Sequence, residues 1–188
     1  GNCVAEGFCS MPLASYGDDG NYKYNWDAAN RLDHPINGID WAQAKQFCRF
    51  IKGRLPTEAE WEKAARGGCN LYGETCATDM PTHPWGEQSP DCSLASLKTD
   101  DGTNSSGCGT GATLAVGARP DGASPYGVQG LAGNLREFTA DFYDSAYYGN
   151  SPPENPTGPD ETGIVVIRGS SFASNDMSKF RSSFRAAD

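Results

Sequence analysis

Apolar residues recur at helical spacing in two stretches of the chain, which lie between residues 40 and 67. The first stretch has four apolar residues at the spacing of one buried helix face: Trp41, Ala44, Cys48 and Ile51. Asp40 suits the N-cap of this helix, and Gly53 is expected to supply a left-handed residue at its C-terminal end. The pattern therefore predicts a helix between Asp40 and Gly53, with Cys48 on its apolar face.

The second helix is predicted from its N-terminal signal as well as from its periodicity. Thr57 and Glu60 have the spacing of a capping box, and Pro56 blocks helix before the cap. The predicted buried face consists of Trp61, Ala64 and Ala65, and the helix is expected to end at the glycines 67 and 68. We interpret the acidic residues of this helix as favouring the helix dipole, and not as a catalytic cluster; they are Glu58, Glu60 and Glu62.

Alternation of apolar and polar residues, the pattern of a half-buried strand, is weak along the chain. The best predicted strand is residues 164–167, which are all apolar and β-branched. Such a run is typical of a strand that is buried on both faces. Residues 1–39 and 69–116 are expected to be irregular, with Trp85 buried in a turn. Because no repeat, linker or low-complexity tract interrupts the sequence, we expect residues 1–188 to form a single domain.

Composition and charge narrow the function classes. The 188 residues include 23 Gly and 12 Pro, which favours a loop-rich globular fold. The net charge of −9 repels phosphate backbones, so nucleic acid is not expected as a partner. No apolar run approaches the roughly 20 residues that span a bilayer, so no membrane span is expected. The chain starts at Gly1 without a signal peptide, which indicates a mature, trimmed or excised product.

The 7 cysteines are spaced as three local pairs with one residue left over. The predicted disulfides are Cys3–Cys9, Cys69–Cys76 and Cys92–Cys108. Disulfides indicate an oxidising compartment, so we expect an extracellular, cell-surface or periplasmic location. Zinc ligation is less favoured, because the chain has no Cys-x-x-Cys and its two histidines, His34 and His83, both precede proline. Cys48 is either a buried free thiol or half of a long-range disulfide.

Seven segments taken together resemble the formylglycine-generating enzyme (sulfatase-modifying factor) family. They are HPINGIDW at 34–41, GRLPTEAEWEKAARG at 53–67, PWG at 84–86, GASPYG at 122–127, AGN at 132–134, NPTGP at 155–159 and VIRG at 166–169. The resemblance implies an α+β fold, a C-type-lectin-like variant with two helices, short twisted antiparallel strands, much irregular structure and disulfide staples.

The resemblance also implies copper chemistry, which this chain departs from. Active members of the family place two copper-binding, oxidising cysteines after an Arg-Gly-Gly-Ser-(Trp/Tyr) motif. Here residues 168–172 read RGSSF, and residues 173–180 contain no cysteine. Since a pair of soft thiolates is what holds copper(I), we do not expect copper, and we assign no catalytic residue.

Calcium is a second implication of the resemblance. The implied ligands are two main-chain carbonyls and one carboxylate, from Gly133, Leu135 and Glu137. Gly130 replaces a family side-chain ligand, and fewer oxygens weaken a calcium site. Alternatively, Glu137 caps the chain locally or pairs with Arg136 or Arg168. A second, weaker calcium site would fall near residues 96–97.

The family usually has one strand before the position of Cys3 and ends on Gly-Phe-Arg-Cys after the position of Asp188. That final cysteine often pairs with the one that matches Cys48. The resemblance therefore implies that this domain lacks its first and last strands. Alternatively, a neighbouring chain completes the sheet, or Cys48 is a buried free thiol.

Three functions follow. The favoured hypothesis is a non-catalytic recognition module that binds protein or glycan through C-terminal loops, as some family members do. Its candidate residues are Tyr143, Tyr147, Ser171, Phe172, Ser174, Asn175 and Lys179. For the tyrosines, packing against the strand is the competing interpretation. The alternatives are a sulfatase-modifying oxidoreductase that converts a substrate cysteine to formylglycine, and a structural subunit of an extracellular assembly.

Overall fold

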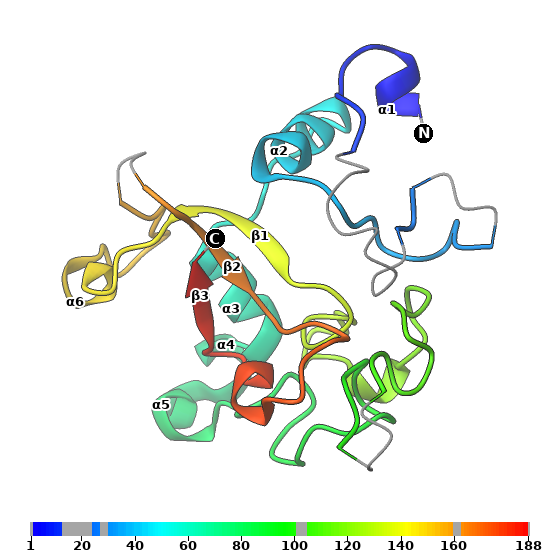
Figure 1. The fold of residues 1–188 in the computed structure, drawn as a ribbon. Helices are drawn as coiled ribbons and strands as arrows, with labels where there is room; N and C mark the ends of the chain where they lie inside the picture. The colour runs from blue at the N-terminus through cyan, green and yellow to red at the C-terminus, as the bar shows by residue number, and fades with distance from the viewer. Residues whose placement is uncertain (1, 13–23, 27–29, 101–104, 160–162, 188) are drawn as a thin grey trace.

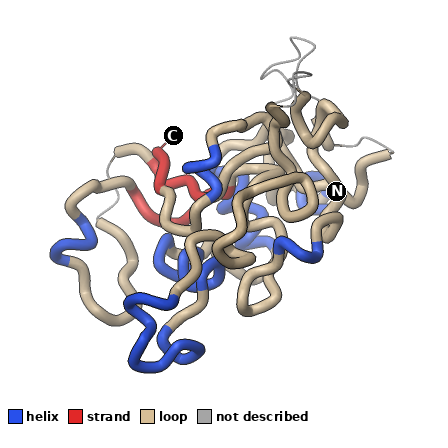
Figure 2. Tube along the Cα trace, turned by 90° about the horizontal axis from the view of Figure 1, so that it is seen from below, coloured by secondary structure: helices blue, strands red, loops and turns tan. Residues whose placement is uncertain are grey.

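The structure is a computed structural model that describes residues 2–12, 24–26, 30–100, 105–159 and 163–187. Long irregular segments connect a few short elements, as the tan tube of Figure 2 shows. The helices are α1 (Asn2–Ala5), α2 (Trp41–Phe50), α3 (Glu58–Arg66), α4 (Cys69–Tyr72), α5 (Cys76–Asp79) and α6 (Tyr147–Asn150), with 3-10 turns η1 (Gly73–Thr75), η2 (Pro120–Gly122) and η3 (Met177–Phe180). The strands are β1 (Glu137–Phe142), β2 (Val165–Arg168) and β3 (Arg185–Ala187). The high irregular content agrees with the predicted fold class.

The three described strands form an antiparallel sheet in the order β1-β2-β3 (Figure 1). Glu137 lies opposite Arg168 in the register, which shifts between Phe138 and Phe142. The central position of β2 explains why Val166 and Ile167 are buried, as the sequence predicts for a strand covered on both faces. Ile164 is the exception, because it lies outside the strand and is exposed.

Helix α2 begins as predicted but ends differently. The Asp40 side chain accepts a hydrogen bond from the Gln43 amide, and the Gln43 side chain accepts one from the Asp40 amide. The prediction for the C-terminal end was wrong at two positions. Lys52 adopts the left-handed conformation, with φ 61°, in place of Gly53. Ile51 is the C-cap and leaves the helical face, so it is 59% exposed.

Helix α3 confirms its predicted signals. Thr57 and Glu60 form the capping box, and Gly67 ends the helix with φ 83°. Trp61 and Ala65 are buried and pack with Leu131 in one core cluster. The helix lies against β1 and β2 behind the sheet in Figure 1. It thereby covers the face of the sheet that carries Arg168.

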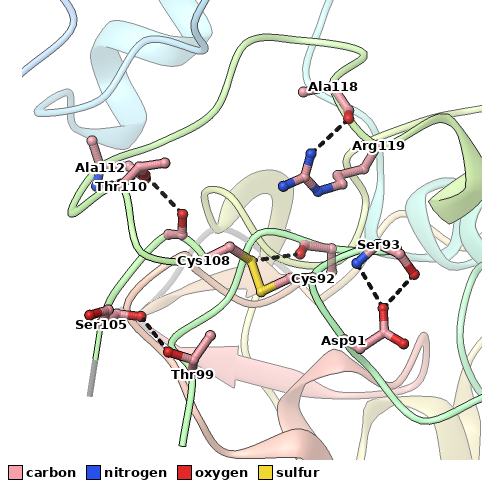
Figure 3. Close-up of a disulfide and its surroundings, with 12 residues drawn as sticks. Asp91, Cys92, Ser93, Thr99, Ser105, Cys108, Thr110, Ala112, Ala118 and Arg119 are labelled. Atoms are coloured by element: carbon pink, nitrogen blue, oxygen red, sulfur yellow. Dashed lines mark hydrogen bonds between the residues drawn. A yellow bond between two sulfur atoms is a disulfide. The ribbon is translucent and has the colours of Figure 1, made fainter. Parts of the chain in front are cut away.

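The second core cluster lies among the loops. It contains Ala95, Leu97, Ala132 and Phe180, with Trp85, Cys92 and Cys108 packed against it. Trp85 is half-buried, less than predicted. The Cys92–Cys108 disulfide joins two of the loops that carry this cluster (Figure 3). In this loop region, the Cys92–Cys108 disulfide and a small apolar cluster therefore hold the chain in place of regular secondary structure.

All three predicted disulfides are present: Cys3–Cys9, Cys69–Cys76 and Cys92–Cys108. Cys48 is unpaired and half-buried on α2, where burial raises the pKa of its thiol. The expectation that residues 69–116 are irregular is wrong at its start. There the short helices α4 and α5 each begin at one cysteine of a disulfide pair. No helix within the described residues combines the length and apolar character needed to cross a membrane.

Candidate functional site

Asn134 joins three loops that are far apart in the sequence. Its amide donates to the Ser96 carbonyl at 2.9 Å, and its carbonyl accepts from the Phe172 amide at 2.8 Å. Its side chain bonds both main-chain groups of Leu114, accepting from the amide at 2.9 Å and donating to the carbonyl at 3.1 Å. Asn tolerates the left-handed backbone, with φ 62° here, better than most residues. Asn134 therefore fixes the relative positions of the three loops.

The glycines beside these loops permit the close approach. A Cβ on Gly133 would overlap the Ser96 carbonyl oxygen, and one on Gly122 would overlap the Leu94 carbonyl oxygen. Gly133 also has φ 84°, a conformation that favours glycine. Residues 94–96 consequently lie directly against the loops that contain the two glycines.

The N-terminal segment is held against the same loops by the buried Asn25. Its Nδ2 donates to the Pro35 carbonyl at 2.6 Å and to Thr113 Oγ1 at 2.9 Å. His34 Nδ1 lies 2.8 Å from the same hydroxyl. These bonds hold the start of residues 35–39 next to Thr113, which precedes the Leu114 that Asn134 binds.

A cleft of about 680 Å³ lies between these segments. The segments that line it are residues 35–39, 94–96, 114–119, 134–138 and 171–173, with further single residues such as Tyr24, Ala44 and Leu55. Its volume falls within the roughly 300–1,000 Å³ that is usual for small-molecule sites. With this volume and lining it is the first candidate for a binding site.

Glu137, the predicted calcium ligand, lies on the cleft wall together with Leu135. Its Oε2 accepts a hydrogen bond from Trp61 Nε1 at 2.5 Å. Burial raises the pKa of this carboxyl, which the Trp61 bond only partly offsets. The alternative that Glu137 pairs with Arg136 or Arg168 was wrong, because its partner is an indole. With Gly133 and Leu135 it offers three oxygens of the 6–8 that calcium takes, so calcium remains a prediction.

The acidic residues of α3 do more than favour the helix dipole. Glu58 is buried, and both its oxygens accept from Arg185, at 2.6 Å from Nε and 2.8 Å from Nη2. Arg168 is 0% exposed, and its Nη2 donates to Glu62 at 2.6 Å. Arg168 Nη1 lies 3.5 Å from Glu58. Glu58 and Glu60 both lie in the first turn, as the interpretation from the sequence requires, and the Glu60 carboxylate also serves the cap and the exposed Arg54.

The predicted ligand-binding tyrosines belong to this ionic network and not to the cleft. The Arg185 guanidinium lies over the rings of Tyr143 and Tyr148, at 4.9 Å and 5.0 Å from the ring centroids. The Tyr148 hydroxyl donates to Glu58 at 3.4 Å, and burial raises its pKa. Tyr147 packs edge-on against Tyr148. These contacts agree with the competing interpretation of packing beside the sheet, but Tyr143 and Tyr148 are 40% and 41% exposed, so ligand binding by the tyrosines stays a prediction.

The other predicted ligand-binding residues lie together after β2. Phe172 is 4% exposed and forms part of the cleft wall, so it is not a surface contact as predicted. Ser174 accepts the Lys98 amide through its carbonyl, and Asn175 Nδ2 donates to Asp100 at 3.2 Å. Lys179 pairs with Asp176 at 3.4 Å. With Ser171 on the cleft wall, these residues make a polar surface next to the cleft.

The copper centre that the resemblance implies does not fit this chain. Six cysteines are in disulfides, and Cys48 lies on α2, away from η3 in Figure 1. Within the ranges that the structure describes, no three His, Cys, Asp or Glu side chains gather as a metal site. The segment after β2 offers hydroxyls, an amide, a carboxylate, an ammonium group and one thioether, that of Met177, and a single thioether does not replace a pair of soft thiolates.

Reasoning from sequence missed the residues that build the cleft. Asn134 stood in the AGN motif, and a Gly-Asn pair within a loop does signal a left-handed turn. Asn25 and Arg119 gave no such signal, because their role depends on partners that are distant in the sequence.

Comparison with known proteins agrees with the fold. The profile of the FGE-sulfatase family, described as the sulfatase-modifying factor enzyme 1-like domain, matches residues 14–188. A formylglycine-generating enzyme of Streptomyces coelicolor is 34% identical over 151 residues, which cover 80% of this chain and 46% of that protein. The serine/threonine-protein kinase pkn1 of Chlamydia pneumoniae is 34% identical over 143 residues, 75% of this chain and 19% of that protein.

Among solved structures, Treponema denticola variable protein 1 is similar over 98% of this chain and 74% of that chain. Its TM-score is 0.60 and its sequence identity 16%, so the likeness concerns the fold alone. The match covers 46% of the length of the formylglycine-generating enzyme and 19% of the length of the kinase, so the chain spans less than half of either relative. The motifs, the α+β architecture and the profile match together establish that this chain belongs to the FGE-sulfatase family.

Proposed function

We propose that this chain is a recognition domain of the FGE-sulfatase family that binds a protein or glycan ligand and does not oxidise cysteine. The observation that carries the proposal is the segment of residues 171–180. It contains no thiol, and its side chains form a polar surface beside the cleft. Short polar side chains on a rigid frame are adaptable hydrogen-bonding groups at binding surfaces.

The main alternative is a sulfatase-modifying oxidoreductase, which the names of the curated relatives favour. That chemistry needs a thiolate pair, and one free thiol on α2 does not supply it. An iron centre of three histidines is not available from this chain either, because it has two histidines. Fold alone does not determine function, so the residues of the site decide between the hypotheses.

A turnover assay tests this choice. The purified chain is incubated with copper(I), oxygen, a reducing thiol and a cysteine-containing peptide, and the peptide is followed by mass spectrometry. We expect no formylglycine, while the enzyme of Streptomyces coelicolor serves as the positive control. Formation of formylglycine at a rate comparable to that control would refute the proposal.

Binding through residues 171–180 has its own test. The chain is applied to a printed glycan array and compared with the double variant Asn175→Ala, Lys179→Ala. In the part of the chain that the structure describes, these side chains bond only Asp100 and Asp176, so we expect the variant to keep its thermal stability and lose the ligand. Unchanged glycan binding by the variant would place the ligand elsewhere.

We also propose an extracellular or periplasmic location. Three disulfides in a chain of 188 residues are typical of an oxidising compartment. Recognition of a protein or glycan outside the cell is consistent with that placement.

A further inference from the structure

The cleft wall contains polar atoms that have no partner in the protein. Tyr24 Oη, Ser96 Oγ and Arg119 Nε are buried and form no hydrogen bond, and all three residues line the cleft. Ser96 is 3% exposed, so solvent does not reach its hydroxyl freely. Leaving a buried donor or acceptor unpaired costs free energy. Three of the eight residues with such an atom in the described ranges line this one cleft, so the cleft is the first place to look for a ligand that supplies missing partners.

The ionisable groups on this wall are two arginines, Arg119 and Arg136, and one carboxyl, Glu137, which accepts a hydrogen bond from Trp61; the chain as a whole is acidic at −9. Among the described residues, Arg119 donates only to the neighbouring Ala118 carbonyl, at 3.0 Å, and Figure 3 shows its guanidinium turned toward that oxygen. Arg136 lies on the same cleft and is exposed. Neither has a carboxylate partner within the described part of the chain. By contrast, Arg66 and Arg168 pair with Glu62.

The remaining wall is largely aliphatic and aromatic. Its apolar residues come from every segment of the cleft: Ile36, Ile39, Leu55, Leu114, Val116, Phe138 and Ile167. Ile36 and Val116 are exposed, so an apolar ligand group that covers them would remove them from water. The volume of about 680 Å³ suits a molecule of the size of a short peptide.

We propose that the cleft binds a small carboxylate that has an apolar body, of the size of a capped dipeptide. The Arg119 guanidinium binds the carboxylate, because charge-assisted bonds from arginine to a carboxylate are strong and directional. Arg136 adds positive potential, the hydroxyls of Ser96 and Tyr24 bond the polar groups of the ligand, and the aliphatic wall holds its side chains. This inference deepens the proposed function and rests on it, since residues 171–173 form part of the same wall.

The test compares two probes that differ only in the charged group. N-acetyl-leucyl-leucine and its C-terminal amide are titrated into the ¹⁵N-labelled chain in the presence of EDTA. We expect saturable amide shifts in residues 94–96, 114–119 and 171–173, with the acid binding about tenfold or more tightly than the amide. Arg119→Gln is expected to remove that preference.

Arg119→Gln should remain folded, because it removes an Nε that has no partner and one hydrogen bond from Nη1 to the neighbouring Ala118 carbonyl. The matched control is Arg49→Gln, an exposed arginine on α2 outside the cleft, which should leave both affinities unchanged. Arg119→Lys keeps the charge and should retain part of the preference for the acid.

Three results would overturn the inference. The first two are equal affinity for acid and amide, and an Arg119→Gln variant that still prefers the acid. The third is the absence of a saturable shift with either probe up to roughly 10 mM, a concentration at which even a site of millimolar affinity saturates. These failures are distinct from failure of the proposed function. Formylglycine formation with copper(I) would remove the proposed function whatever the titration shows, whereas loss of acid selectivity removes only the carboxylate site.

Discussion

Substitution of Arg168 by methionine tests how much the buried ionic network stabilises the fold. Arg168 is completely buried, and it donates to the Phe184 carbonyl at 2.7 Å and to the Ser182 carbonyl at 2.8 Å. Its Nη2 also bonds Glu62, and its guanidinium lies 4.9 Å from the ring centroid of Trp61. Methionine keeps an unbranched apolar stem against that ring but removes the charge and every donor.

The loss leaves two carbonyls and a Glu62 oxygen without the donor they have in the native fold. Glu58 keeps its bidentate contact with Arg185, so the network is broken on one side only. Breaking a buried ion pair by removal of one partner costs about 3–5 kcal/mol. For a domain of this size, about 2–4 °C of melting temperature corresponds to each kcal/mol, so we expect a decrease of roughly 6–20 °C.

The assay is thermal and urea unfolding followed by circular dichroism, with disulfides intact. The matched control is Arg54→Met, which removes an equally short Arg–Glu pair, 2.7 Å from Glu60, where Arg54 is 66% exposed. Exposed pairs contribute about 0.2–1 kcal/mol. If Arg168→Met does not fold, Arg168→Lys, which keeps the charge, is measured in its place. Equal losses in the Arg168 and Arg54 variants would refute the claim that burial makes this network important.

Three further predictions concern Glu137 and the disulfides. Burial raises the pKa of Glu137 in the folded state, so its protonation contributes stability below the unfolded pKa of about 4.3, and this contribution is lost as the pH rises through the folded pKa. In EDTA, Glu137→Gln should therefore stabilise the chain at pH 8 relative to wild type but not at pH 4; a difference in melting temperature that is constant with pH would contradict this. If Glu137 binds calcium, 2 mM CaCl₂ should raise the melting temperature of the wild type and not that of Glu137→Gln. At a hundredfold excess of calcium over Kd, the gain in free energy of unfolding is about 2.7 kcal/mol. Equal responses of the two proteins would place calcium elsewhere. Replacing Cys92 and Cys108 by serine should lower the free energy of unfolding in urea by about 3 kcal/mol, because the bridge closes a loop with a sequence separation of 16. The same change at Cys3 and Cys9, with a separation of 6, should lower it by less. The reverse order would show that loop length does not set the effect.

Local features of the fold followed from the sequence. The capping box of Thr57 and Glu60 needs only residues three positions apart, and the local disulfides follow from spacing. The errors arose where tertiary contacts override local preference. Glu58 reads as an exposed acid of a first turn, yet its carboxylate meets Arg185, 127 residues away. No local pattern reports such a partner.

The candidate site was predictable only in part. The segment after β2 could be identified as unusual because it lacks the two cysteines that active members of the family have there, and residues 171–173 do line the cleft. Phe172 was misplaced on the surface because its flanking residues are polar, while its backbone is drawn inward by Gly107 and Asn134. The cleft itself depends on loops that approach through main-chain bonds, which carry no signature in side-chain composition.

The bonds of Asn134 have a consequence for how the sequence can change. All its partners are main-chain atoms, namely the carbonyl of Ser96, the amide of Phe172 and both groups of Leu114. The contribution of Asn134 to the position of the three loops is therefore independent of their own side chains. Substitutions on the outward sides of these loops can accumulate while the frame persists, so one asparagine allows the binding surface to diversify independently of the architecture.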